Sequence, residues 1–148
     1  MSRPHAESEL LSPLLDWLHH RGRIRFDTLV TVEMPWYGRR IDLVTLTRSG
    51  RLTAYELKIN TNQRVIEQAT YNSMAFDSSY VVTGRLPSER SRAMALEAGL
   101  GIIVVGSDVQ LLQQAVTVVH SLELRKKLIT KVQAKAGAWE CLRPSLTI

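Results

Sequence analysis

The sequence predicts a single α/β domain with a mixed central sheet, spanning residues 1–148. Three strand-like runs follow one another in the first half with only short polar turns between them, which is typical of an antiparallel meander. In the second half, strand-like runs alternate with helical patterns, which indicates crossover connections and parallel strands. A chain of 148 residues, 45% of them hydrophobic, can bury a substantial core without disulfide or zinc support.

The first half begins with an amphipathic helix over residues 7–20, which Gly22 ends. Its apolar positions recur at helical spacing, namely Leu10, Leu11, Leu14, Leu15 and Leu18. Three strands are expected next, over residues 25–34, 40–47 and 52–59. Only short polar turns separate them, so the three strands should be antiparallel neighbours.

The second half begins with a helix over residues 61–76, which Thr61 or Asn62 can cap. Behind it we expect a strand over 79–83, a helix over 87–98, a strand over 101–106 and a short edge strand over 109–112. A basic helix over about 121–136 follows. The predicted order is therefore αβββαβαβ(β)α, with helices flanking the sheet.

Composition and charge limit the classes of function. Nineteen Lys and Arg against 14 Asp and Glu give a net charge of +5, which favours an anionic partner such as nucleic acid. No apolar run approaches the roughly 20 residues of a membrane span, and acidic residues stand where a signal peptide needs apolar ones. We therefore expect a cytoplasmic protein without a membrane partner. Cys141 is the single cysteine, which excludes an internal disulfide and a cysteine-rich zinc site.

The strongest chemical signal lies on the second and third predicted strands. Asp42 stands among apolar residues on one strand, and 14 residues later Glu56 and Lys58 share one face of the next. An acid in an apolar run is costly to bury unless it is paired. Two carboxylates on neighbouring strands also repel one another unless a cation lies between them, which is the arrangement that a divalent metal requires.

The first predicted helix adds a third acid. Glu7 precedes Leu10, Leu11 and Leu14 by three, four and seven residues, which places it on the apolar stripe that faces the sheet. From that position its carboxylate could reach the end of the meander.

These residues, in this order of elements, resemble the PD-(D/E)xK nuclease superfamily, which includes restriction endonucleases and Holliday-junction resolvases. The resemblance rests on Asp42, on Glu56-x-Lys58 in the next strand, on the acid of the preceding helix and on the αβββαβ order. It covers residues 7–112. It implies a restriction-endonuclease-like core, extended here by the C-terminal helix, and a DNA endonuclease that depends on Mg²⁺ or Mn²⁺.

The resemblance implies a role for each acid and for the lysine. Asp42, Glu56 and the backbone carbonyl of Leu57 would be metal ligands. Glu7 would contribute through a metal-bound water or a second metal. Lys58 would orient the attacking water and offset charge on the scissile phosphate, because a hard cation and a lysine together neutralise the charge that phosphodiester hydrolysis builds.

One residue of the following helix also matches. Gln68 resembles the glutamine that many members place beside the lysine. Some helicase-associated members carry a tyrosine four residues after this glutamine, whereas Tyr71 follows here after three.

DNA contacts are expected from basic residues near the site and on the last helix. Arg39 and Arg40 immediately precede the strand with the first acid and are the expected phosphate clamps. The last helix offers Lys126, Lys127 and Lys131, although such a basic face can also be simply solvated. Small nucleases of this type often pair to cut two strands, so a homodimer is compatible with this interpretation.

Two other interpretations stay open at this point. One is a nuclease-fold module that has lost cleavage and only binds nucleic acid or a protein partner. The other is an α/β domain of a different class, such as a nucleotide-binding domain, although the chain lacks both the G-x-G-x-x-G and the Walker-type glycine motifs. Glu56 and Lys58 would then be an ordinary same-face pair on a strand.

Overall fold

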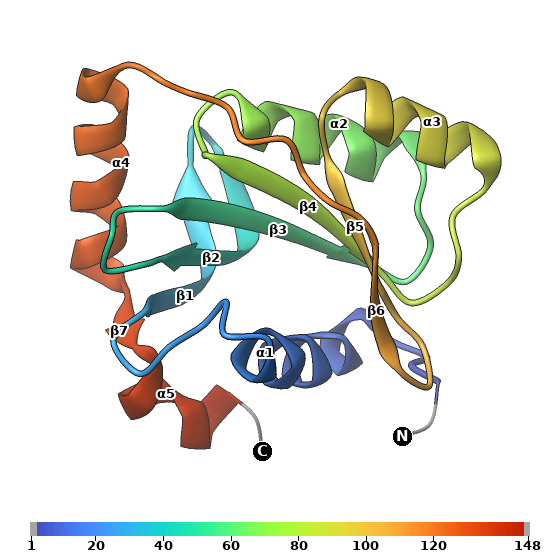
Figure 1. The fold of residues 1–148 in the computed structure, drawn as a ribbon, viewed down its shortest axis with the longest axis horizontal. Helices are drawn as coiled ribbons and strands as arrows, with labels where there is room; N and C mark the ends of the chain where they lie inside the picture. Colours follow the sequence, from blue (N-terminus) through green and yellow to red (C-terminus); the bar gives the residue numbers. More distant parts are fainter. Residues whose placement is uncertain (1–2, 147–148) are drawn as a thin grey trace.

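The computed structural model describes residues 3–146, in which one mixed sheet carries helices on both faces (Figure 1). The 3-10 turn and the helices are η1 (Glu7–Glu9), α1 (Leu11–His20), α2 (Gln63–Ser73), α3 (Glu89–Glu97), α4 (Leu122–Lys135) and α5 (Trp139–Leu146). The strands are β1 (Leu29–Trp36), β2 (Arg39–Leu46), β3 (Leu52–Lys58), β4 (Ser78–Thr83), β5 (Gly101–Val105), β6 (Val109–Gln113) and β7 (Gly137–Ala138). None of the described helices is both long and apolar enough to cross a bilayer.

The sheet of the described residues has the order β6-β5-β4-β3-β2-β1-β7. Strands β1, β2 and β3 pair antiparallel, strands β3, β4 and β5 pair parallel, and β6 returns antiparallel along the edge. The predicted meander, the parallel half and the edge strand are therefore confirmed. The mixed α/β fold class is confirmed with them.

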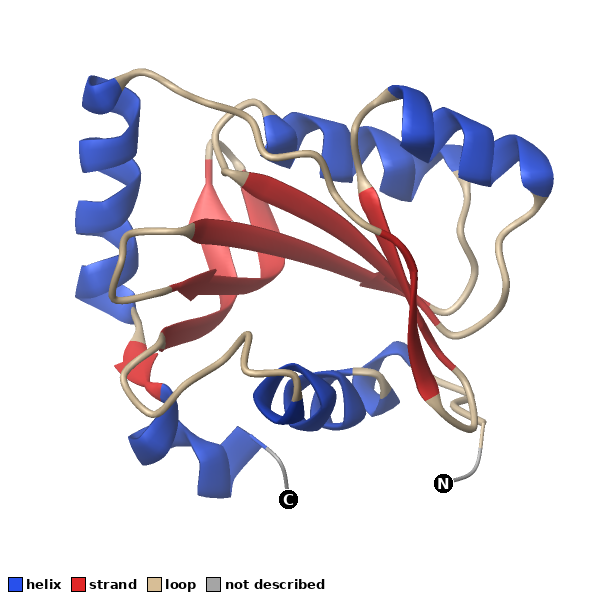
Figure 2. Ribbon diagram, viewed as in Figure 1, coloured by secondary structure: helices blue, strands red, loops and turns tan. Residues whose placement is uncertain are grey.

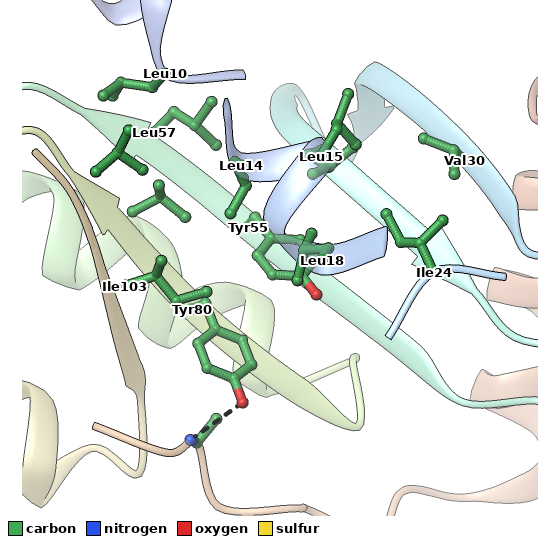
Figure 3. Close-up of a cluster of buried hydrophobic side chains, with 14 of the residues drawn as sticks. Leu10, Leu14, Leu15, Leu18, Ile24, Val30, Tyr55, Leu57, Tyr80 and Ile103 are labelled. Atoms are coloured by element: carbon green, nitrogen blue, oxygen red, sulfur yellow. Dashed lines mark hydrogen bonds between the residues drawn. The ribbon is translucent and has the colours of Figure 1, made fainter. Parts of the chain in front are cut away.

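The helices form two layers that enclose the sheet (Figure 2). In the view of Figure 1, α1 and α5 lie below the sheet, α2 and α3 lie above it, and α4 closes one side. The buried leucines of α1 pack on Tyr55 and Leu57 of β3, as Figure 3 shows. On the other face, Leu128 and Val132 of α4 are buried in a second cluster. Both faces of β3 are thus covered, and all but the last of its residues are buried.

The first helix is shorter than predicted. Residues Glu7–Glu9 form a separate 3-10 turn and α1 starts at Leu11, so Glu7 does not lie on the apolar stripe of α1, and it is exposed. Pro13 explains the difference. In a helix that began at residue 7, the ring of Pro13 would clash with the carbonyl four residues back, whereas at the third position of α1 its missing N–H costs nothing.

The first strand also starts later than predicted. Residues 21–28 turn away from α1 before the strand begins at Leu29. The backbone N–H of Arg25 donates to Thr28 Oγ1 at 2.9 Å, and the backbone N–H of Thr28 donates to the Arg25 carbonyl at 3.0 Å. These local bonds satisfy backbone groups that an early strand would have had to pair across the sheet.

Strand β1 changes faces at Glu33. This residue has a φ of 50°, in the left-handed region that non-glycine residues rarely adopt. Before it, Val32 packs against the cluster beneath α1, and after it Met34 packs in the cluster beneath α4. The left-handed residue therefore interrupts the alternation that a regular strand would keep.

The side chains of β2 switch faces at the same point, because β2 pairs with β1 on both sides of the bend. Leu43 pairs with Val32 and shares its cluster, and Ile41 pairs with Met34 and shares the other cluster. Asp42 lies between them, opposite the left-handed residue of β1. The tip of the β1–β2 hairpin consequently rises out of the sheet toward α2 and α4 (Figure 1). This bend is the feature that positions the candidate site.

Two C-terminal elements were not predicted from the sequence. Strand β7 adds two residues to the edge of β1, and α5 follows it directly. Trp139, the first residue of α5, is 1% exposed, and its Nε1 donates to Nδ1 of His19 at 3.1 Å. The C-terminal segment therefore completes the core beneath α1.

Replacing Trp139 should test whether this segment is part of the cooperative fold. A Trp139→Ala change should lower the free energy of unfolding by about 3–5 kcal/mol, the usual cost of emptying a buried aromatic site. Val119→Ala is the matched control, because Val119 is 92% exposed and its loss should cost no more than about 0.5 kcal/mol. Urea unfolding of both variants gives the comparison, and equal stabilities would show that the C-terminal segment is not docked.

Candidate active site

Asp42 and Glu56 come together where β2 leaves β3. The β2–β3 ladder ends at the Leu43–Tyr55 pair. Beyond it, Asp42 Oδ2 accepts the backbone N–H of Leu57 at 2.8 Å, so a side chain replaces the backbone of β2 as the partner of β3. The Asp42 and Glu56 carboxyls lie within hydrogen-bonding reach of each other. The sequence predicted this meeting from two acids on neighbouring strands, and the bend of the hairpin produces it.

Leu57 contributes its backbone to the same place. Its side chain is buried on the opposite face, in the cluster beneath α1 (Figure 3). In a strand, the N–H and C=O of one residue point to the same edge. The Leu57 carbonyl is therefore directed toward β2, as is the N–H that bonds Asp42.

Glu56 is buried and held by a chain of polar contacts. It is 4% exposed, and its Oε1 accepts a hydrogen bond from Asn72 Nδ2 of α2 at 2.9 Å. Asn72 Oδ1 in turn accepts from the Arg39 guanidinium at 2.9 Å. Arg39 also donates to the Gln68 backbone carbonyl at 3.4 Å and lies 5.2 Å from the centre of the Tyr71 ring. The tip of the hairpin is thus fastened to α2 directly beside the buried acid.

The environment raises the pKa of Glu56 to about 8. Burial is the largest cause, because it disfavours the charged carboxylate, and the neighbouring Asp42 raises the pKa further by charge repulsion and by sharing a hydrogen bond. The bond from Asn72 and the charge of Arg39 act in the opposite direction. At neutral pH the Glu56 carboxyl therefore tends to keep its proton.

Glu7 and Lys58 form a second pair at the end of β3. Glu7 Oε1 lies 3.0 Å from the Lys58 Nζ, and both side chains are substantially exposed, at 50% and 37%. The amine of Lys58 is therefore paired with an acid from the η1 turn and not with Glu56 on its own strand. Glu7 thus reaches the end of the meander, as expected, but from a turn outside the helix stripe.

The three expected acids do not form one cluster. Within residues 3–146, no group of three or more His, Cys, Asp or Glu side chains is arranged so that it could hold a metal ion. The oxygen donors that do converge are the carboxyls of Asp42 and Glu56 and the backbone of Leu57. Glu7 stands apart from them, on the amine of Lys58.

An aromatic groove adjoins the site on the side of α2 and α4. It encloses a volume of about 560 Å³ and is lined by Trp36, Tyr37, Arg39, Tyr71, Met74, Ala75 and Leu124. Tyr37 and Tyr71 are 69% and 60% exposed, so their rings are available at its rim. Arg39 joins this groove to the Asn72–Glu56 contact.

The basic residues expected to contact DNA differ in their surroundings. Lys127 Nζ donates to the Tyr37 hydroxyl at 2.8 Å, and Lys131 Nζ lies 5.5 Å from the centre of the Trp36 ring. Both therefore fasten α4 to the hairpin. Arg40 and Lys126 are exposed to solvent. The charge of α4 thus lies along the same surface as the groove.

Sequence reasoning did not identify Asn72. This residue is fully buried, and it connects Glu56 to Arg39. Its position four residues after Gln68, one helical turn later, was the available signal, because residues four apart share a helix face.

Stability should depend on pH through Glu56 when no divalent metal is present. The Glu56 carboxyl holds its proton more tightly in the folded chain than in the unfolded one. Protonated Glu56 therefore stabilises the fold fully below pH 4.5, the ordinary pKa of the group, and this stabilisation is lost as the pH rises to about 8. Melting temperatures in EDTA should fall across this range. Glu56→Gln, whose amide can still bond Asn72 and Asp42, should flatten the decline, and an unchanged profile would contradict the raised pKa.

Comparisons with known proteins give the fold and little more. No family model matches the chain, and no curated protein matches it. The chain is similar to a protein of unknown function from Silicibacter pomeroyi, with a TM-score of 0.59 and 15% identity over 88% of this chain and 86% of that one. At this level of identity the likeness shows a shared fold.

Two further solved structures are more distant. One is a repair endonuclease from Pyrococcus abyssi, with a TM-score of 0.49 and 13% identity over 71% of this chain and 50% of that one. The other is SfsA from Pyrococcus furiosus in complex with Ca²⁺, with a TM-score of 0.45 and 12% identity over 76% of this chain and 65% of that one. Both scores are too low to support an argument about function. The comparisons therefore place the chain by its mixed α/β fold and leave its activity to the geometry of the site.

Proposed function

We propose that this chain is a metal-dependent DNA endonuclease that hydrolyses phosphodiester bonds. Asp42, Glu56 and the backbone carbonyl of Leu57 would hold Mg²⁺ or Mn²⁺. The observation that carries the proposal is the closeness of the Asp42 and Glu56 carboxyls where Asp42 accepts the backbone N–H of Leu57.

The donor set fits a hard divalent cation. Two carboxyls and a carbonyl offer the oxygen ligands that Mg²⁺ prefers. Each carboxyl uses one oxygen in a fixed contact, Asp42 Oδ2 with Leu57 and Glu56 Oε1 with Asn72, and retains the other for a ligand. The pKa of Glu56 is raised by its burial and by the nearby Asp42 carboxyl. A bound cation would favour the charged form of Glu56 in place of the proton.

Side chains near the cation site would contribute to hydrolysis in different ways. A bound cation would neutralise charge on the phosphate and acidify a water molecule. Lys58 brings a positive charge to the same face of β3, where it can offset charge on the scissile phosphate. Glu7 holds the amine of Lys58 in place through their ion pair. Gln68 lies on α2, half-buried one turn before Asn72.

Nucleic-acid binding would use the surface between α2 and α4. Arg40 and Lys126 are exposed cations suited to phosphate contacts. The rings of Tyr37 and Tyr71 border the groove next to Arg39, and aromatic rings can stack on bases. The groove and the acid pair share Arg39, so a strand in the groove would pass close to the acids.

Activity and stability should separate in variants of the acid pair. Glu56→Gln and Lys58→Ala should each lower Mg²⁺- or Mn²⁺-dependent cleavage of plasmid and branched DNA by about 10²-fold or more, since each removes a preorganised charge. Neither should unfold the chain. Glu9→Gln, in the same turn as Glu7, is the matched control and should retain activity.

The same experiment distinguishes the alternative, an inactive module that only binds nucleic acid or a protein partner. Wild-type protein that binds DNA but shows no cleavage with Mg²⁺ or Mn²⁺, above an EDTA control, would support that alternative. If both variants melt at a lower temperature and the wild type does not cleave DNA, Glu56 and Lys58 have a structural role.

DNA affinity should fall steeply as salt rises, because phosphate contacts release counterions. Lys126→Gln should weaken binding to all sequences alike and reduce the slope of log affinity against log salt by about 1. Lys135→Gln, at the far end of the same helix, is the control. Fluorescence anisotropy over a salt series measures both slopes. A DNA affinity that does not change with salt would show that DNA does not bind through this surface.

A further inference from the structure

The face of the sheet beneath α1 carries a row of hydroxyl side chains that the acid site does not use. Thr45 of β2 pairs with Thr53 of β3, and Thr53 pairs with Ser78 of β4. Register partners on neighbouring strands point to the same face. All three are buried, at 2%, 7% and 1% exposed. Small polar residues therefore stand side by side where the neighbouring positions of the sheet carry large apolar ones.

A cavity of about 210 Å³ opens over this row, beyond the end of α1. It is lined by Gly22, Arg23, Thr45, Thr47, Arg51, Thr53, Tyr55, Ser78 and Tyr80. Tyr55 and Tyr80 stack with ring centres 5.5 Å apart. In Figure 3 their hydroxyl oxygens point away from Leu10 and Leu57. The described lining consists of hydroxyls, backbone and two guanidinium groups, with no carboxylate.

Both arginines direct positive charge at this cavity. Arg23 donates to the Tyr80 hydroxyl at 3.1 Å and to Gln114 Oε1 at 3.0 Å. Arg51 donates to Ser78 Oγ at 2.7 Å and to Thr117 Oγ1 at 3.0 Å. These contacts use two of the five N–H donors of each guanidinium.

No carboxylate of the described residues neutralises either charge. In the described part of the chain, the ion pairs of Asp and Glu involve other partners, and neither Arg23 nor Arg51 has a carboxylate within ion-pair distance. Both charges act on the Tyr55 hydroxyl and work to lower its pKa, although burial dominates and keeps that hydroxyl protonated. Among the described residues, the Thr53 hydroxyl has no protein hydrogen-bond partner. The cavity thus offers donors and two positive charges to a single small anion.

We propose that this cavity binds a phosphate group. A phosphate fits the volume, and guanidinium groups and hydroxyls are the donors that recognise its oxygens. The cavity adjoins a second hollow of about 470 Å³, which shares Gly22, Arg23 and Thr47 with it. That hollow adds Arg25, Phe26 and the Arg48–Asp27 ion pair to the lining, so one of its cations is already paired. The remainder of a phosphate-bearing molecule has room there. The site lies on the opposite face of β3 from Glu56 and Lys58, so it does not depend on cleavage.

Binding of inorganic phosphate to the full chain tests the site. In EDTA, phosphate should raise the melting temperature more than chloride at equal ionic strength, because a ligand of the folded state stabilises it. Titration calorimetry should show that Thr53→Val, which keeps the shape of the side chain, weakens phosphate binding by about tenfold. Arg51→Gln should weaken it by at least about tenfold.

Two controls separate this site from other effects. Arg90→Gln, on exposed α3 across the sheet, should retain the full response to phosphate. Glu56→Gln should also retain it, so failure of the proposed nuclease activity leaves this result intact. No stabilisation beyond that of chloride, or an unchanged affinity in Thr53→Val, would overturn the proposal even if Arg51→Gln proved unstable.

The source of the phosphate is distinguished by competition. Adenosine monophosphate that competes with inorganic phosphate, when a DNA duplex does not, would identify a small soluble ligand. A 5′-phosphorylated oligonucleotide that competes, when its 5′-hydroxyl counterpart does not, would identify a nucleic-acid end. Either result supports the phosphate site. Competition by both oligonucleotides with equal strength, undiminished in Thr53→Val, would assign the binding to the general basic surface and overturn it.

Discussion

The departure of β2 from β3 at Asp42 is the constraint on which the site depends. At that position the carboxylate of Asp42, and not a backbone carbonyl, takes the N–H of Leu57. A side chain can only do this if its own strand has moved away, and the left-handed Glu33 on the paired strand accompanies the bend. The same bend carries the hairpin tip to α2 and α4, where Arg39 meets Asn72. The same bend of the sheet therefore brings the acid pair and the aromatic groove next to the basic helix α4.

Much of this was predictable from local pattern. Strand alternation assigned Glu56 and Lys58 to one face, and the apolar neighbours of Asp42 indicated an acid in a strand interior. Turn lengths gave the antiparallel meander, and the helix between β3 and β4 gave the parallel pair, because short connections and crossovers allow few other topologies. Asn62 caps α2 by accepting the N–H of Val65, as one of the two residues expected to do so. These are local or nearest-neighbour effects, and the chain encodes them locally.

The remainder required three-dimensional context. Nothing in the residues around Glu33 signals a left-handed conformation, since that is forced by packing on both sides of the bend. Asn72 looks like a solvent-facing helix residue until Glu56 and Arg39 approach it from two strands. The partner of Lys58 likewise comes from η1, far away in the chain. Strand β7 is too short for any periodicity, and Trp139 is buried only because β7 brings it beneath α1.

The two-sided use of β3 has a consequence for how the protein can change. Thr53 and Tyr55 face the hydroxyl cavity, while Glu56 and Lys58 serve the opposite face, all within one seven-residue strand. A shift of one residue in a strand turns every side chain to the other face. An insertion or deletion between Thr47 and Leu52 would therefore place hydroxyls among the carboxyls and a carboxyl beneath α1. We infer that the length of this tight turn is under stronger constraint than its composition.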